Sequence, residues 1–329
     1  MSAQRLLRHT LSPERIGLNA TGADDLPLRR RPAFDSFEYI QSCGRPVGKA
    51  VAARINSLAI PPAWQRVRIS QDPKNFVLAV GDDDAGRRQY VYHPRWREAC
   101  EQAKFIDLPR FAEALPRLRS QVKKDLKNED DLQTYAKATV VRLLDRAGLR
   151  VGSWGNTTFG AVSLQTDHIE IARDIAVLDF TGKGGAARHA EIKDATLISA
   201  LSTLYDDAET SIFVCDDQRI TASSVNAYIK SASGLDFTAK DFRTWGGSVR
   251  AARSIFKHGA TTIKEVSEAA SAWLGNTPTI ARNSYIHPAI IEAVATQPKM
   301  TLTGPVRLRK YERAAHSLMS DYSASLPSA

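Results

Sequence analysis

Four short segments of the sequence carry side chains that could break a phosphodiester bond without a metal ion or an attacking water. They centre on Arg150, Lys183, Arg243 and Tyr285. A tyrosine can act as the nucleophile, and two guanidinium groups can stabilise the charge on a pentacoordinate phosphorus. A lysine can donate a proton to the departing alkoxide, which is a strong base. The chain therefore offers one residue type for each task of phosphoryl transfer.

The neighbouring residues extend these positions into motifs. The motifs are residues 148–152 (GLRVG), 180–184 (FTGKG), 240–245 (KDFRTW) and 274–288 (LGNTPTIARNSYIHP). In this order they resemble the active site of the type IB DNA topoisomerases, most closely the poxvirus and bacterial branch, whose catalytic fold is related to that of tyrosine recombinases. Residues 60–64 (IPPAW) and 89–97 (QYVYHPRWR) add to a resemblance that covers residues 35–300.

The resemblance implies a role for each side chain. Tyr285 attacks the DNA and becomes joined to a 3′ phosphate, Lys183 is the general acid for the leaving 5′ oxygen, and Arg150 and Arg243 stabilise the transition state. Religation by the 5′ hydroxyl then needs neither ATP nor a metal, so we expect no cofactor. The sequence around Lys183 agrees, because it lacks the glycine and hydroxyl residues of a phosphate-binding P-loop.

Two positions depart from the family pattern. Family members usually carry histidine nine residues before the tyrosine, where this chain has Asn276. Asparagine can donate a hydrogen bond to a phosphate oxygen but cannot transfer a proton near neutral pH. Some bacterial relatives share it, so activity is still expected. Residues 153–158 replace a longer segment that family members use on DNA, so the preferred cleavage sequence cannot be carried over.

A strand predicted near residue 90 offers a surface for DNA. Arg88, Tyr90 and Tyr92 alternate onto one face of a regular strand, where they present a charge for phosphates and aromatic groups for a groove. By resemblance Gln89, Tyr90 and Tyr92 face the major groove. Gln89 falls on the opposite face of a regular strand, so its role requires the strand to twist or end there.

Periodicity of the apolar residues predicts the elements that must position these groups. One predicted helix, residues 132–147, is bounded by Asp130 or Asp131 as N-cap and by Gly148 as C-cap. A glycine-rich hairpin turn at residues 182–185 places Lys183 at its tip. The predicted helices include 111–126, 132–147, 246–258 and 262–274, and the predicted strands include 67–70, 75–80 and 88–92.

These elements predict an α+β protein that forms a clamp around duplex DNA. A small, mostly β N-terminal clamp domain spans residues 36–103, and a larger, mostly α catalytic domain with a β-hairpin spans residues 110–300. Residues 1–35, which include three consecutive arginines, are expected to be a flexible arm. Residues 301–329 form a C-terminal extension of unassigned function, and residues 100–109 are expected to be the hinge between the domains.

Composition limits the remaining possibilities. The 329 residues carry a net charge of +9, which suits a polyanionic partner, and we expect that partner to be duplex DNA, preferably supercoiled. The sequence has no long apolar run and no secretory signal, so we expect a cytoplasmic protein that does not bind membranes. The resemblance to the bacterial branch implies that it is bacterial, nucleoid-associated and monomeric. Three widely spaced cysteines support neither a disulfide framework nor a thiolate metal site.

Two other functions remain open at this point. Tyrosine recombinases place the same residue types in the same order, but they typically carry histidine three residues before the second arginine, where this chain has Lys240. The 60–64 segment also has no recombinase counterpart. A catalytically inert DNA-binding clamp is the second alternative. It would require the loss of a catalytic residue, and only the asparagine departs from the usual set.

Overall fold

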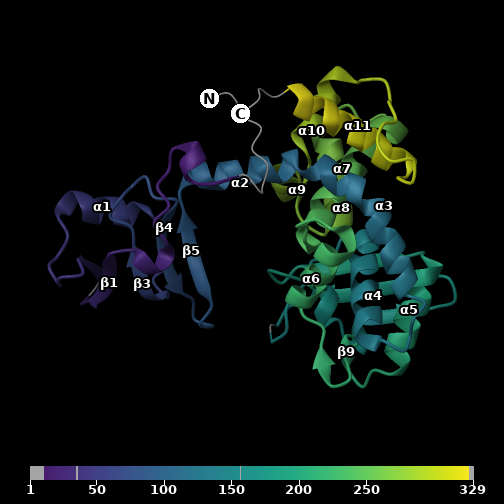
Figure 1. The fold of residues 1–329 in the computed structure, drawn as a ribbon, viewed down its shortest axis with the longest axis horizontal. Coiled ribbons are helices and arrows are strands. Elements are labelled where there is room, and N and C mark those ends of the chain that lie inside the picture. The colour runs from purple at the N-terminus through teal and green to yellow at the C-terminus, as the bar shows by residue number, and fades with distance from the viewer. Residues whose placement is uncertain (1–10, 35, 156, 326–329) are drawn as a thin grey trace. The chain divides into compact units, whose positions relative to one another are not determined.

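The computed structural model describes residues 11–34, 36–155 and 157–325. The chain divides into two compact units, and it passes from the first to the second between Lys104 and Phe105 (Figure 1). The first unit contains an antiparallel sheet and the second is mostly helical, which confirms the predicted α+β class. None of the described helices combines the length and hydropathy of a membrane span.

The first unit is built on a five-stranded antiparallel sheet in the order β2-β1-β3-β4-β5. Its strands are β1 (Leu28–Ala33), β2 (Ser36–Ile40), β3 (Gln65–Ile69), β4 (Val77–Asp82) and β5 (Arg88–Tyr92). Helix α1 (Lys49–Ser57) buries Ile55 against Leu28, Val67, Ile69 and Ala79 of the sheet. Strand β5 lies at an edge, so it has a strand partner on one side.

The expectation of a flexible arm over residues 1–35 was wrong for residues 28–33, which form β1. Leu28 is buried and pairs with Ile69, which places the strand between β2 and β3. The strand lacks the alternation of apolar and polar residues that predicts strands, because three consecutive arginines occupy it and make polar contacts. Arg30 donates to the carbonyls of Pro61 and Pro62, and Arg31 pairs with Glu38 at 2.8 Å. Residues 1–10 and 35 of the predicted arm lie outside the described residues.

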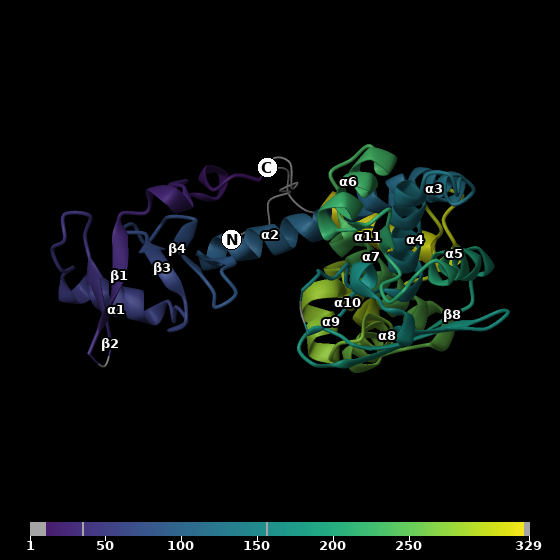
Figure 2. The ribbon, with the colours of Figure 1, turned by 90° about the horizontal axis from the view of Figure 1, so that it is seen from below.

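The second unit packs helices around a central pair, α4 (Leu132–Ala147) and α7 (Ala239–His258). Figure 2 shows α7 among its neighbours. A three-stranded antiparallel sheet supplies the hairpin: β6 (Ile169–Ile171), β7 (Ala176–Thr181) and β8 (Ala187–Ile192). A short ribbon pairs β9 (Val214–Cys215) with β10 (Gln218–Arg219). The remaining helices are α3 (Leu108–Asp125), α5 (Ala195–Asp206), α6 (Ala222–Ser233), α8 (Ile263–Leu274), α9 (Pro278–Tyr285), α10 (Pro288–Thr296) and α11 (Lys310–Ser325).

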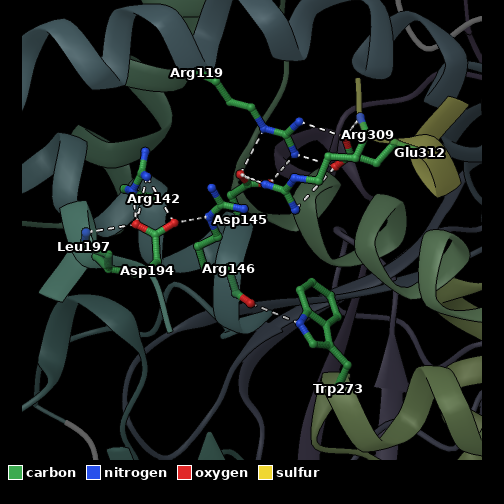
Figure 3. A network of polar contacts seen from close by, with 9 residues as sticks. All are labelled: Arg119, Arg142, Asp145, Arg146, Asp194, Leu197, Trp273, Arg309 and Glu312. Atoms are coloured by element: carbon green, nitrogen blue, oxygen red, sulfur yellow. Dashed lines mark hydrogen bonds and ion pairs between the residues drawn. The ribbon is translucent and has the colours of Figure 1, made fainter. Parts of the chain in front are cut away.

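Two predicted boundaries differ from the structure. The segment expected as a hinge is helical, because α2 (Pro94–Ile106) runs through most of it and α3 begins after a single turn residue, Asp107. In the C-terminal extension, α11 packs into the second unit and buries Ala315 and Met319 in the core of that unit. Glu312 of α11 also joins an ion-pair network with Arg119 and Asp145 (Figure 3). Residues 326–329 lie outside the described residues.

Candidate active site

Arg150 is positioned by the end of α4. Asp131 caps the start of this helix by accepting a hydrogen bond from the Thr134 amide, and Gly148 ends it in the left-handed conformation with φ of 63°. A side chain at Gly148 would collide with the Trp273 ring, because its Cβ would lie 2.8 Å from that ring. Glycine therefore lets α8 approach closely while the chain turns to present Arg150.

Arg243 is fixed inside α7. Only 4% of it is exposed, and its guanidinium donates to the carbonyl of Gly148 and, at 3.1 Å, to that of Leu274. These bonds tie the ends of α4 and α8 to the N-terminal part of α7. Burial lowers the pKa of Arg243 from its ordinary value, and the Arg150 charge adds to this, although Tyr285 partly offsets both. Among the residues that the structure describes, no carboxylate forms an ion pair with this guanidinium, so its charge is available to an anion.

Tyr285 ends α9 directly beside Arg243. The guanidinium carbon lies 4.9 Å from the centre of the tyrosine ring. The Ser248 hydroxyl donates to the Tyr285 carbonyl at 3.0 Å and holds the backbone in place. Burial opposes ionisation of the phenol, but Arg243, Arg150 and Lys240 together outweigh it, and the pKa of Tyr285 is lowered from its usual value near 10. The surroundings thus favour the phenolate, which is the attacking form.

Lys183 lies at the tip of the β7–β8 hairpin. The turn is closed by a hydrogen bond from the Gly182 amide to the Ala186 carbonyl at 2.8 Å, and Gly184 and Gly185 both have positive φ. Lys183 is exposed, yet it lines the same pocket as Arg150 and Arg243. The structure therefore brings Arg150 and Arg243 together with one exposed amine. Within the described ranges, no group of three His, Cys, Asp or Glu side chains could hold a metal ion.

Asn276 occupies the loop between α8 and α9. Both the oxygen and the nitrogen of its amide are buried, and among the described residues neither has a hydrogen-bond partner. A buried amide without partners costs free energy, commonly about 1–3 kcal/mol per group. Such a group is suited to binding a phosphate oxygen of a substrate, which agrees with the role expected for the family histidine at this position.

Arg188 belongs to the site and was missed by the sequence analysis. It lies on β8, is 8% exposed, and donates to the carbonyls of Ala147 at 2.6 Å and Trp273 at 2.7 Å. It crosses Gly275, where a Cβ would lie 2.6 Å from its Nη1 atom. Burial and the charges of Arg243 and Arg150 lower its pKa to about 10. Arg188 thus joins the ends of α4 and α8 and lines the same pocket as Arg150 and Arg243.

A signal for Arg188 exists in the sequence. Arg188 and Ile192 are four residues apart on one strand and therefore share the face that points into the unit. The burial of β8 follows this pattern, since Arg188 and Ile192 are buried while Ala187 and His189 are exposed. An arginine on the inward face of a hairpin must find acceptors inside the unit, so this pattern indicates a buried structural cation.

In the first unit, the tyrosines predicted to bind DNA lie together, and Gln89 does not join them. Tyr90 and Tyr92 stack with ring centres 5.6 Å apart, and Tyr90 is 41% exposed. Arg88 on the same face pairs with Asp24. Gln89 is in register with Gly81, and its amide donates to Asp83 at 3.0 Å. The pairing register is unbroken at this point and the strand continues to Tyr92, so neither a bulge nor a strand end brings Gln89 to the face of the tyrosines.

Comparison with known proteins identifies two family models along the chain. The model described as eukaryotic DNA topoisomerase I, catalytic core, matches residues 93–296. The model described as bacterial DNA topoisomerase IB, N-terminal domain, matches residues 36–83. The first match contains all five candidate catalytic residues, and the second contains most of the first unit's sheet.

Individual relatives agree with these matches. The chain is 27% identical over 274 residues to DNA topoisomerase 1B of Acanthamoeba polyphaga mimivirus, covering 75% of this chain and 80% of that protein. It is 27% identical over 239 residues to DNA topoisomerase 1B of Vaccinia virus (strain Copenhagen), covering 66% of this chain and 72% of that protein. A structure of the XerH site-specific recombinase bound to a palindromic difH substrate is 14% identical, with a TM-score of 0.37, covering 66% of this chain and 56% of that chain. So weak a structural likeness carries no argument about function.

Proposed function

The chain belongs to the type IB DNA topoisomerase family, and we propose that it relaxes supercoiled DNA by cutting and resealing one strand without metal or ATP. Tyr285 loses its proton to solvent and attacks the phosphorus. A phosphotyrosine bond forms at the 3′ end while the bond to the 5′ oxygen breaks. Resealing reverses these steps, and because one ester replaces another, no nucleotide is consumed.

The observation that carries this proposal is the arrangement of cations around Tyr285. Arg243 contacts its ring, Arg150 and Lys183 line the adjoining pocket, and the pKa of the phenol is lowered despite its burial. Arg150 and Arg243 neutralise the non-bridging phosphate oxygens, and the Asn276 amide donates one further hydrogen bond. Lys183 transfers its proton to the departing 5′ oxygen.

We propose that both units bind the duplex and together form a clamp. The stacked Tyr90 and Tyr92, with Arg88, contact the DNA from the domain of residues 36–103, while the domain of residues 110–300 carries out the chemistry. Gln89 would have to release Asp83 to reach a base edge. A monomer suffices, because one chain supplies every catalytic group, and chromosomal DNA in the nucleoid is the natural substrate.

Relaxation of supercoiled plasmid by purified protein, with EDTA and without ATP, tests the proposal. We expect both positive and negative supercoils to be removed, and we expect high salt to weaken DNA binding because phosphate contacts release counterions. A strict requirement for Mg²⁺ or ATP would overturn the proposal. Recombinant products in place of relaxed circles would identify a recombinase, and DNA binding without any relaxation would identify an inert clamp.

A further inference from the structure

A second cavity lies along α7 in the catalytic unit, which is the second of the two compact units, and it shares no lining residue with the pocket of Arg150, Lys183 and Arg243. Its volume is about 110 Å³, several times the roughly 10–15 Å³ that one water requires. Helices α4, α7, α8 and α11 contribute to its wall. The charged and aromatic residues in its lining include Asp145, Trp245, Arg250, Arg253, Trp273, Arg309, Tyr311 and Glu312.

The two carboxylates in the wall are already neutralised. Arg119 binds Asp145 through two nitrogens, at 2.8 and 3.0 Å, and binds Glu312 in the same way at 2.6 and 3.0 Å (Figure 3). Arg309 lies 3.8 Å from Asp145 and 3.9 Å from Glu312. Two arginines therefore balance two carboxylates. Among the described residues no ion pair links this network to the other cations of the cavity, although the charges of Glu312 and Asp145 act on Arg250 from a distance.

Arg250 and Arg253 are those other cations, one turn apart on α7. Arg250 lies 5.5 Å from the Trp273 ring centre and Arg253 lies 5.8 Å from that of Tyr311. An aromatic face attracts a guanidinium but leaves its N–H groups without acceptors. In the described part of the chain, neither side chain forms a hydrogen bond or ion pair, and the Arg253 Nε atom is buried without a partner. Burial and the charge of Arg253 lower the pKa of Arg250, and the charges of Glu312 and Asp145 offset part of this.

Trp245 adds a neutral donor to the same wall. Its side chain is 2% exposed, and among the described residues its indole Nε1 has no hydrogen-bond partner. The surplus groups of the cavity are thus all donors, with two uncompensated positive charges. Water can accept from them, but it brings no negative charge.

We propose that this cavity binds a small phosphate-class oxyanion. A tetrahedral dianion has only acceptors, and its charge balances Arg250 and Arg253, whose forked N–H groups match pairs of oxygens. The Trp245 indole donates a further hydrogen bond. The site is separate from the catalytic pocket, and it does not depend on the function proposed above.

The indole N–H signals of the five tryptophans provide a direct test by NMR of the full chain. Sodium phosphate is titrated at constant ionic strength against sodium chloride. We expect the Trp245 signal to move with phosphate and to saturate, and to stay in place with chloride. Equal movement in both salts would overturn the proposal, because it would show a general salt effect.

Three variants locate the binding site. Arg253→Gln and Arg250→Gln should each raise the phosphate Kd by at least about tenfold, since each removes a charged hydrogen bond. The matched control Arg307→Gln removes the same charge from an exposed position of the same unit and should leave the Kd unchanged. The other indole signals show whether each variant is folded. Equal Kd values in all three variants would contradict the site.

Two further arms separate possible origins of the signal. Arg150→Ala weakens anion binding in the catalytic pocket and should leave the movement of the Trp245 signal with phosphate intact. If that movement disappeared in the variant, the signal would have come from the catalytic pocket. A nucleoside 5′-monophosphate is then compared with inorganic phosphate. Tighter binding of the nucleotide would identify a phosphate ester as the ligand, and equal or weaker binding would identify free phosphate. Failure of both to bind would refute the site.

Discussion

Arg243 and Lys183 line the same pocket but are held in opposite ways. Arg243 is buried near the start of a long helix and bonded to two backbone carbonyls. Lys183 is exposed at a glycine-rich hairpin tip. A group that stabilises developing charge gains most from being fixed before the reaction, because no reorganisation is then needed. A proton donor must instead reach an atom that moves as the bond breaks, and a turn suits that task.

The largest effect is expected from removing the nucleophile, which sets the baseline for this comparison. Tyr285→Phe should abolish covalent attachment to DNA and leave non-covalent binding within a few fold, because only one oxygen is lost. Trapping of the covalent adduct on a denaturing gel measures the first quantity, and gel shift measures the second. An adduct that maps to another tyrosine, such as Tyr311, would show that the site is assigned wrongly.

Lys183→Ala should slow single-turnover cleavage by about a hundredfold to ten-thousandfold, the usual contribution of a general acid. A DNA substrate with sulfur in place of the leaving 5′ oxygen should restore much of this rate, since a thiolate leaves without a proton.

Arg243→Ala is the control for that rescue. Sulfur at the leaving atom does not remove the charge on the non-bridging oxygens, so this variant should gain little from it. Equal rescue of both variants would remove the distinction between the fixed cation and the exposed acid.

Arg188→Met tests whether the fixed half of the site depends on its anchor. Two backbone carbonyls lose a donor, at about 1–3 kcal/mol each. Removing the buried charge should stabilise the folded state by about 3 kcal/mol. At pH 7 the arginine is protonated in both the folded and the unfolded chain, so the whole free-energy difference that corresponds to a folded-state pKa of about 10 destabilises the native protein. Thermal stability should therefore change little, while cleavage falls by about tenfold to a hundredfold through misplaced arginines. A large loss of stability with normal cleavage in the folded fraction would make Arg188 purely structural.

The smallest effect is expected at Asn276. Asn276→Ala removes one neutral hydrogen bond to the phosphate, so cleavage should fall by about threefold to tenfold. Because the amide has no partner in the described structure, the free energy of unfolding should stay the same or rise. A loss larger than that of Arg243→Ala would mean that the amide contributes more than a neutral donor can.

Local signals predicted the parts of the fold that end in strong caps. Residues 132–147 were predicted as a helix from Asp131 and Gly148, and α4 has these bounds. The strand at 88–92 and the hairpin turn around Lys183 were also confirmed. In each case the turn or cap chemistry and the hydrophobic period agree within a short window, so no distant contact was needed.

Distant contacts explain the failures. Helix α7 was predicted from residue 246 but begins at Ala239, because Thr238 and Asp241 cap it and because Gly246 is an interior helical residue. A Cβ at Gly246 would lie 2.1 Å from the Trp273 ring, so this glycine serves packing and does not break the helix. Arg188 escaped notice for a similar reason, since its partners lie 41 and 85 residues away.

The network of Arg119, Asp145 and Glu312 joins segments of the catalytic unit that are synthesised at different times. Arg119 and Asp145 leave the ribosome well before Glu312, so a nascent chain lacks both the second carboxylate of the network and the apolar contacts of Ala315 and Met319. Apolar core surface left in water is costly, and domains tend to fold as units during translation. We infer that the nascent catalytic unit stays incompletely folded until residues 310–325 have emerged, which delays assembly of the site until well after its own residues have been synthesised.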